Sequence, residues 1–279
     1  GLVGFSIGSE TWGSIVSPSN RNGVTGLRPS FGTVSRSGAM ALSWTMDKLG
    51  PMTRSVEGAA IIFETIRGSD NIDRTVRDVP FIYPSKRGLK NLRIGYIASA
   101  FVDSSVSEND KASLDVLKSM GLNLIPIELP KFPTQALSFV LQAEAAAAFD
   151  ELTRSNKDDQ LVRQVKSAWP NVFREARFIP AVEYINANRA RTLLNQKMSE
   201  LMEKIDVYII PSFYGDNLLR TNLTGHPCVV VPNGFNKKGR PTSISFVGGL
   251  YSDGNTLAVA KAYQEATKWH KQYPPEFNN

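Results

Sequence analysis

Glycine and hydroxyl side chains crowd the stretch from Gly8 to Ser19, which directly follows an apolar run over residues 1–7. Glycine adopts backbone conformations that are closed to other residues and lets a ligand approach the main chain closely. Successive backbone N–H groups in such a turn form a concave site for an anion. We therefore predict a strand that ends in an anion-binding loop, and we expect the rest of the fold to support that loop.

Farther along the chain, apolar patterns alternate between strand and helix. Residues 92–97 and 122–127 are predicted strands on either side of a helix over about 107–120, and such a β-α-β unit implies a parallel pair. Three more strands, the last two joined by a hairpin, are predicted at 206–211, 228–232 and 242–247. The predicted fold class is α/β, a mixed twisted sheet covered by helices on both faces.

Helical periodicity and capping residues place the other helices. These helices cover 56–66 with Ser55 as cap, 133–153, 158–168, 181–204, and about 255–270 with Asp253 or Asn255 as cap. The helix over 181–204 is amphipathic, and its apolar side is expected to pack in the core. That side consists of Val182, Ile185, Leu194, Met198 and Leu201.

The polar segment 69–90 has no sustained period, so we predict a surface crossing there. It would join two lobes, 1–68 and 91–279, of a single domain over 1–279. The only cysteine, Cys228, lies in an apolar setting and is expected to be buried.

Composition narrows the class of protein. Apolar residues make up 42% of the chain and charged residues 21%, as in ordinary globular proteins, and no apolar run is long enough to span a bilayer. The net charge is +6, but the basic residues are scattered among acidic ones, so nucleic acid is not an expected partner. No residues show metal-ligand spacing. We predict neither a metal nor a cofactor, and we expect a cytoplasmic protein.

Three motifs, at Ser9–Ile15, Gly23–Gly38 and Asp47–Arg54, resemble the amidase signature family in order and spacing. That family hydrolyses amides with a serine nucleophile, which is activated by a second serine on a cis peptide and by a lysine. The resemblance implies that Ser14 is the nucleophile. It also implies that the backbone N–H groups of Thr11, Trp12, Gly13 and Ser14 form the oxyanion hole.

The chain departs from the family pattern in three respects. Trp12-Gly13-Ser14 stands where many members have Gly-Gly-Ser. Val16 and Ser17 stand where many members carry an arginine, so a carboxylate-bearing substrate is not favoured. The family's lysine and cis serine belong to segments upstream of this turn, and the chain begins too late to contain them. We therefore expect a C-terminal portion of an amidase, close to inactive by itself, and a small-molecule amide as the substrate of the intact protein.

Other interpretations remain open. The family includes the glutamine-hydrolysing subunit of tRNA-dependent amidotransferases, and a noncatalytic fragment or a homo-oligomer is also compatible with the sequence. A different chemistry starts from Ser6, because Gly4-Phe5-Ser6-Ile7-Gly8 fits the nucleophile elbow of α/β-hydrolases. The acid and base of that triad would be Asp206 or Asp216 and His226 or His270.

The substrate-binding residues are not identified by any motif. Aromatic and imidazole side chains suited to an acyl pocket are Trp12, Trp44, Phe213, Tyr214 and His226. Asp47 and Arg36 flank the predicted site, and we expect structural roles for both, since each lies among turn-forming residues.

Overall fold

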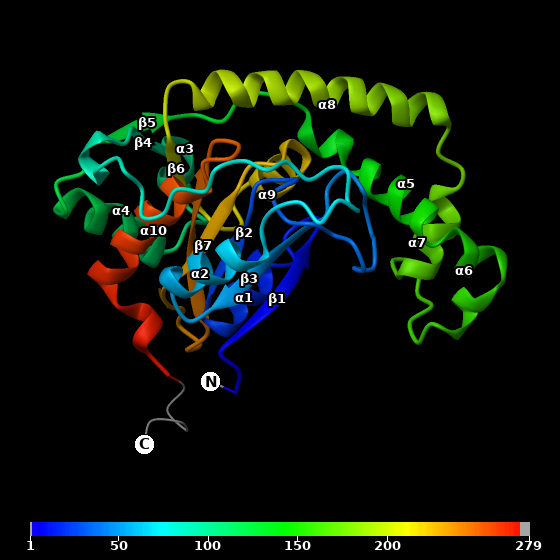
Figure 1. Cartoon of the computed structure of the whole chain (residues 1–279), viewed down its shortest axis with the longest axis horizontal. Helices are drawn as coiled ribbons and strands as arrows, with labels where there is room; N and C mark the ends of the chain where they lie inside the picture. Colours follow the sequence, from blue (N-terminus) through cyan, green and yellow to red (C-terminus); the bar gives the residue numbers. More distant parts are fainter. Residues whose placement is uncertain (1, 274–279) are drawn as a thin grey trace.

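The computed structural model describes residues 2–273, which build one mixed sheet of eight strands (Figure 1). The strand order is β1-β3-β2-β7-β8-β6-β4-β5. The bounds are β1 (Phe5–Glu10), β2 (Thr25–Arg28), β3 (Lys48–Thr53), β4 (Ile94–Ile97), β5 (Leu124–Ile127), β6 (Val207–Pro211), β7 (Cys228–Phe235) and β8 (Pro241–Gly248). Strands from the first 68 residues and from the rest of the chain therefore share one sheet.

Strand pairing follows the predicted pattern. β4 is parallel to β5 and to β6, while the other pairs are antiparallel, which confirms both the β-α-β unit and the mixed sheet. β7 and β8 form the predicted hairpin, and Cys228 at the start of β7 is buried as expected. Between Ile66 and Leu89 the described chain has neither helix nor strand, and the division into two lobes joined by this segment stays a prediction.

Helices cover both faces of the sheet. Their bounds are α1 (Val16–Asn22), α2 (Val56–Ile66), α3 (Ala98–Val102), α4 (Glu108–Ser119), α5 (Phe139–Ala148), α6 (Asp150–Arg154), α7 (Trp169–Ala176), α8 (Ala181–Met202), α9 (Asn217–Thr224) and α10 (Asp253–Thr267). On β2, the Thr25 hydroxyl accepts a hydrogen bond from Gln264 of α10, and the next residue, Gly26, packs against Ser19 of α1. Because successive residues of a strand point to opposite faces, α10 and α1 lie on opposite sides of the sheet.

Two predicted helices differ from the structure. The helix expected over 133–153 is divided into a 3₁₀ turn, α5 and α6. The helix expected over 158–168 is wrong, since only a 3₁₀ turn at Lys157–Gln160 forms there and α7 begins at Trp169. Pro170 explains the later start, because proline lacks an N–H and fits the first turn of a helix. α9 was missed, since its residues carry turn-forming types.

The long helix α8 confirms the prediction over 181–204, but only part of its apolar side is covered. Leu194, Met198 and Leu201 are buried, whereas Val182 and Ile185 are 59% and 57% exposed. In Figure 1, α8 runs along the top of the molecule and connects the sheet with an arm made of residues 134–176, which include α5, α6 and α7. The first turns of α8 therefore leave the main core.

The capping predictions have different outcomes. The Ser55 hydroxyl accepts a hydrogen bond from Gly58 N–H at the start of α2, as predicted. The cap predicted for the last helix is wrong, because Asp253 lies inside α10 and its buried carboxylate instead accepts hydrogen bonds from the N–H (2.9 Å) and hydroxyl (2.7 Å) of Ser30. α10 ends at Thr267, and His270 follows in a 3₁₀ turn. Within residues 2–273, no helix is long and apolar enough to cross a membrane.

Candidate active site

Ser14 lies on a sharp turn between β1 and α1. β1 ends at Glu10, the chain turns through residues 11–15, and α1 begins at Val16. Gly13 has φ +100°, a conformation that side-chain-bearing residues rarely adopt, so glycine is required at this point of the turn. The side chain of Ser14 is exposed, whereas Thr11 and Gly13 on the same turn are buried. The turn is therefore anchored by its buried residues and presents the Ser14 hydroxyl to solvent.

The buried carboxylate of Glu10 holds this turn in place, a role that the sequence did not indicate. Its Oε2 accepts hydrogen bonds from the N–H groups of Ile15 (2.8 Å) and Val16 (2.9 Å). Its Oε1 accepts from Arg28 Nη1 (2.8 Å) and Asn222 Nδ2 (2.8 Å). Burial raises the pKa of Glu10, but the charge of Arg28 and these hydrogen bonds outweigh it and hold the pKa below the ordinary value. An ionised Glu10 thus fixes the residues that follow Ser14.

The main chain just before those residues has unused donors. Among the hydrogen bonds of the described residues, none has the N–H of Thr11, Trp12, Gly13 or Ser14 as its donor, whereas Ile15 and Val16 donate to Glu10. Consecutive free N–H groups on a turn suit an oxyanion. The oxyanion hole at these four residues stays a prediction that this geometry supports.

Asp47 supports the turn from the other side. Its Oδ1 accepts a hydrogen bond from the Thr11 hydroxyl, and its Oδ2 accepts from the N–H groups of Leu42 (2.8 Å) and Ser43 (2.9 Å). The predicted structural role of Asp47 is confirmed, because the carboxylate organises the 42–47 turn and joins it to the Ser14 turn.

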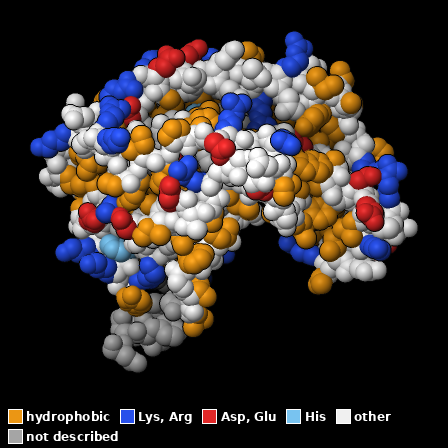
Figure 2. Space-filling view, viewed as in Figure 1, with side chains coloured by type: hydrophobic (Ala, Val, Ile, Leu, Met, Phe, Trp, Pro, Cys, Tyr) orange, Lys and Arg blue, Asp and Glu red, His pale blue; other side chains and the backbone are white. Residues whose placement is uncertain are grey.

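A cavity of about 410 Å³ lies beside Ser14. Thr11, Trp12, Ser14 and Leu42 line it from the sheet side. The arm contributes three apolar side chains, Leu141, Trp169 and Val172, and four neutral polar ones, Gln135, Ser138, Gln142 and Ser167. Figure 2 shows a deep notch between the main body and the arm, with hydrophobic side chains along the arm. The described side chains that line the cavity are all uncharged at neutral pH.

The candidates for an acyl pocket are not brought together. Trp12 lines the cavity at Ser14, whereas Trp44 lines a neighbouring cavity of about 220 Å³. Phe213 and Tyr214 line a third cavity of about 300 Å³, beside Ser105 and Ser243. His226 is buried, and its Nδ1 is hydrogen-bonded to the Thr224 hydroxyl (2.8 Å). The arm residues Gln142 and Trp169 were missed, since their position in the wall of the Ser14 cavity depends on the tertiary fold.

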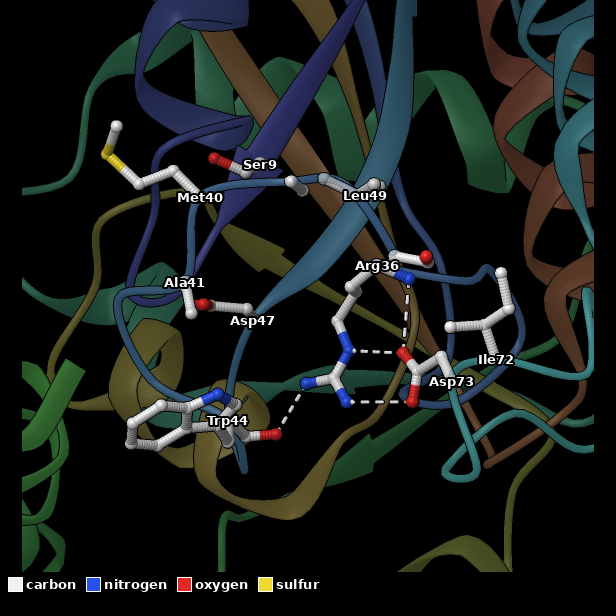
Figure 3. A pocket seen from close by; sticks show the side chains of 11 residues that line it. Ser9, Arg36, Met40, Ala41, Trp44, Asp47, Leu49, Ile72 and Asp73 are labelled. Atoms are coloured by element: carbon white, nitrogen blue, oxygen red, sulfur yellow. Dashed lines mark hydrogen bonds and ion pairs between the residues drawn. The ribbon is translucent and has the colours of Figure 1, made fainter.

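Arg36 has the structural role that we expected. Figure 3 shows its guanidinium held by Asp73 and by the Trp44 carbonyl, at the edge of the second cavity. The ion pair between Arg36 Nε and Asp73 Oδ2 (2.9 Å) is mostly shielded from solvent. It ties the 36–44 loop to the crossing that follows α2.

The nucleophile elbow at Ser6 is wrong. Ser6 lies inside β1, opposite Met52 of β3, and not at a turn from strand to helix. Of its proposed partners, His226 is buried against Thr224, and Asp206 forms ion pairs with Arg87 (3.0 Å) and Arg93 (3.1 Å). These two side chains are therefore engaged elsewhere, and β6, which follows Asp206, is separated from β1 by four strands of the sheet.

Comparisons with known proteins show the family of the chain. The family model described as "Amidase" matches residues 1–220. A glutamyl-tRNA(Gln) amidotransferase subunit from Rippkaea orientalis is 29% identical over 97% of this chain and 65% of its own length. The corresponding subunit from a Picosynechococcus species is 30% identical over 98% of this chain and 67% of its own length. The chain thus spans about 65% of the length of the first of these relatives.

Solved structures share the fold. An amidase family protein from Bacillus anthracis has a TM-score of 0.78 at 28% identity and covers 97% of this chain and 58% of its own. The peptide amidase of Stenotrophomonas maltophilia has a TM-score of 0.79 at 24% identity and covers 100% of this chain and 65% of its own. Because the family model matches residues 1–220 and the fold is that of solved amidases, the chain belongs to the amidase signature family.

Proposed function

We propose that the whole protein hydrolyses a carboxylic amide to an acid and ammonia or an amine through an acyl-enzyme at Ser14. The observation that carries this proposal is the exposed Ser14 hydroxyl on a turn with four unused backbone N–H groups, at the edge of a cavity. Family membership supports it.

In this mechanism the Ser14 oxygen attacks the amide carbon, and the carbonyl oxygen becomes an oxyanion. The N–H groups of Thr11 to Ser14 stabilise that charge, the amine leaves with a proton, and water then hydrolyses the ester on Ser14. A serine hydroxyl needs a base for the first step. The resemblance assigns this role to a lysine and a second serine, and the uncharged lining of the cavity at Ser14 contains no lysine among the described residues.

Lys48 does not fill the role of that base. It is buried and donates hydrogen bonds to the Met46 carbonyl and, at 3.5 Å, to the Asn222 carbonyl. Burial lowers its pKa far below the ordinary value, and the charge of Arg28 lowers it further. Its side chain is not among those that line the Ser14 cavity, so we do not assign Lys48 as the base.

We therefore expect the 279-residue chain alone to be close to inactive. Without an activated hydroxyl, the oxyanion donors should leave at most a residual acceleration of roughly 10³ to 10⁴ over water. Ammonia release from a panel of amides measures this, with a protein extended by the family's lysine and serine segments as the comparison. Equal turnover by the two proteins would show that the chain holds a complete base that we have not identified.

A second candidate function is favoured by the relatives that carry the name of a glutamyl-tRNA(Gln) amidotransferase subunit. In that case the protein is a glutamine-hydrolysing subunit that works with partner proteins. Affinity purification of the tagged protein from its own cells should then recover other subunits in stoichiometric amounts together with tRNA, whereas an independent amidase is recovered alone. A homo-oligomer and a cytoplasmic location stay predictions.

A further inference from the structure

The side of the cavity that faces Ser14 is a wall built by the arm. Trp169 supplies its largest apolar surface and is 44% exposed. Its ring stacks on Phe173 at 5.5 Å, and Phe173 stacks on Phe149 at 4.8 Å. Such a stack restrains the indole before any ligand arrives, so a flat apolar group can bind against it with little loss of freedom.

The polar part of this wall is neutral. Gln135 and Gln142 each carry a primary amide, which both donates and accepts hydrogen bonds, and Ser138 and Ser167 add hydroxyls. Amides and hydroxyls can pair with a neutral polar group of a substrate. The wall offers no cation to a substrate carboxylate, which is costly to take out of water unless a cation or several converging hydrogen-bond donors compensate its charge.

The wall is held in place relative to the Ser14 turn by Glu144, which lies two residues after Gln142 on α5. Its buried carboxylate accepts hydrogen bonds from the Ser43 hydroxyl (2.5 Å) and from the N–H (3.0 Å) and hydroxyl (2.7 Å) of Thr45. The same 42–47 turn is bound by Asp47, which also holds Thr11. The arm and the nucleophile turn are therefore parts of one connected polar network.

We propose that this cavity selects amides whose acyl group is neutral and carries a flat or aromatic part, with Trp169 and Gln142 as specificity-determining residues. The inference rests on the proposed hydrolysis at Ser14 and names its substrate class. The acyl group packs on the Trp169 ring while the amides of the wall bind its polar atoms, which leaves the carbonyl carbon at Ser14.

The test measures the hydrolysis of phenylacetamide, of its 4-carboxy derivative and of L-glutamine by the whole protein. We expect kcat/KM to favour phenylacetamide by at least about tenfold. Gln142→Arg places a cation on the wall. The ratio of kcat/KM for the 4-carboxy derivative to kcat/KM for phenylacetamide should then rise by about tenfold or more. Trp169→Ala should raise KM for phenylacetamide about tenfold, with a smaller change in kcat.

Matched controls exist for both variants. Gln196→Arg adds the same charge on an exposed site of α8, and Trp44→Ala removes an indole of similar exposure from the neighbouring cavity. Neither control should change the preference between the two amides. A shift in either control equal to that of its partner variant would overturn the assignment of the wall.

Calorimetric binding to the Ser14→Ala variant separates this inference from the proposed function, because binding needs no turnover. If no amide is hydrolysed but phenylacetamide still binds more tightly than its carboxy derivative, and Trp169→Ala weakens that binding, the wall selects as proposed and only the reaction is wrong. Equal or tighter binding of the carboxy derivative or of glutamine would overturn the inference, and so would no binding of phenylacetamide.

Discussion

The Ser14→Ala variant of the whole protein is expected to hydrolyse amides at least roughly 10³-fold more slowly than the wild type. The hydroxyl is the proposed nucleophile, and its loss removes the covalent route while leaving the turn intact. Serine to alanine removes one oxygen from an exposed side chain, so the fold should not change. Steady-state ammonia release measures the effect, and circular dichroism checks the fold.

Ser6→Ala is the matched control for that experiment. Ser6 is also exposed, but it lies near the start of β1 and is not among the residues that line the Ser14 cavity. It should keep wild-type turnover. A fluorophosphonate that modifies serine should add its mass to Ser14. If it labels Ser6 instead, and Ser14→Ala keeps wild-type turnover, the nucleophile is Ser6.

The second large effect concerns stability. Glu10→Gln should lower the free energy of unfolding by about 3–5 kcal/mol, because it leaves the Arg28 guanidinium buried without its counter-charge. Both side chains of this ion pair are 0% exposed, and their N–O distance is 2.8 Å. Denaturant unfolding of the 279-residue chain measures this without an activity assay.

The control for this prediction is Glu64→Gln on α2. Its ion pair with Arg67 has a similar distance of 2.8 Å, but the Glu64 side chain is 53% exposed. An exposed pair contributes less than about 1 kcal/mol, since water screens both charges. Equal losses in the two variants would show that the buried pair does not hold the Ser14 turn.

The Glu10 pair also predicts the direction of the pH dependence. The pKa of Glu10 in the folded protein is lower than its ordinary value of 4.5, so the unfolded chain binds the proton more readily. Its contribution to stability is complete above the ordinary pKa and is lost as the pH falls through the lower, folded value. The wild type should therefore lose more stability than Glu10→Gln as the pH falls from the ordinary pKa to more acidic conditions.

Local sequence was sufficient for the parts of the fold that depend on neighbouring residues. The hairpin of β7 and β8, the β-α-β unit and the Ser55 cap follow from periodicity and turn chemistry, which act over a few residues. The position of Ser14 on a turn after a strand was predicted in the same way, because Gly13 supplies a backbone conformation that its own residue type determines.

Local patterns failed where a distant partner decides the outcome. Val182 and Ile185 repeat at helical spacing, but the first turns of α8 extend beyond the core, so the spacing that predicts a helix does not predict its burial. The helix expected over 158–168 does not form, and α7 follows it in the chain. Pro170 determines where α7 begins, and the packing of Phe173 against Phe149 determines where it lies.

The active-site environment depends on the tertiary structure most of all. Glu10 meets Asn222 from 212 residues farther along the chain, and Trp169 reaches the Ser14 cavity only through the arm. No local period links such residues, because their contacts form when the sheet brings distant segments together. The residues near Ser14 thus indicated the family and the proposed nucleophile, while the charge that supports its turn and the wall that faces it were decided by long-range packing.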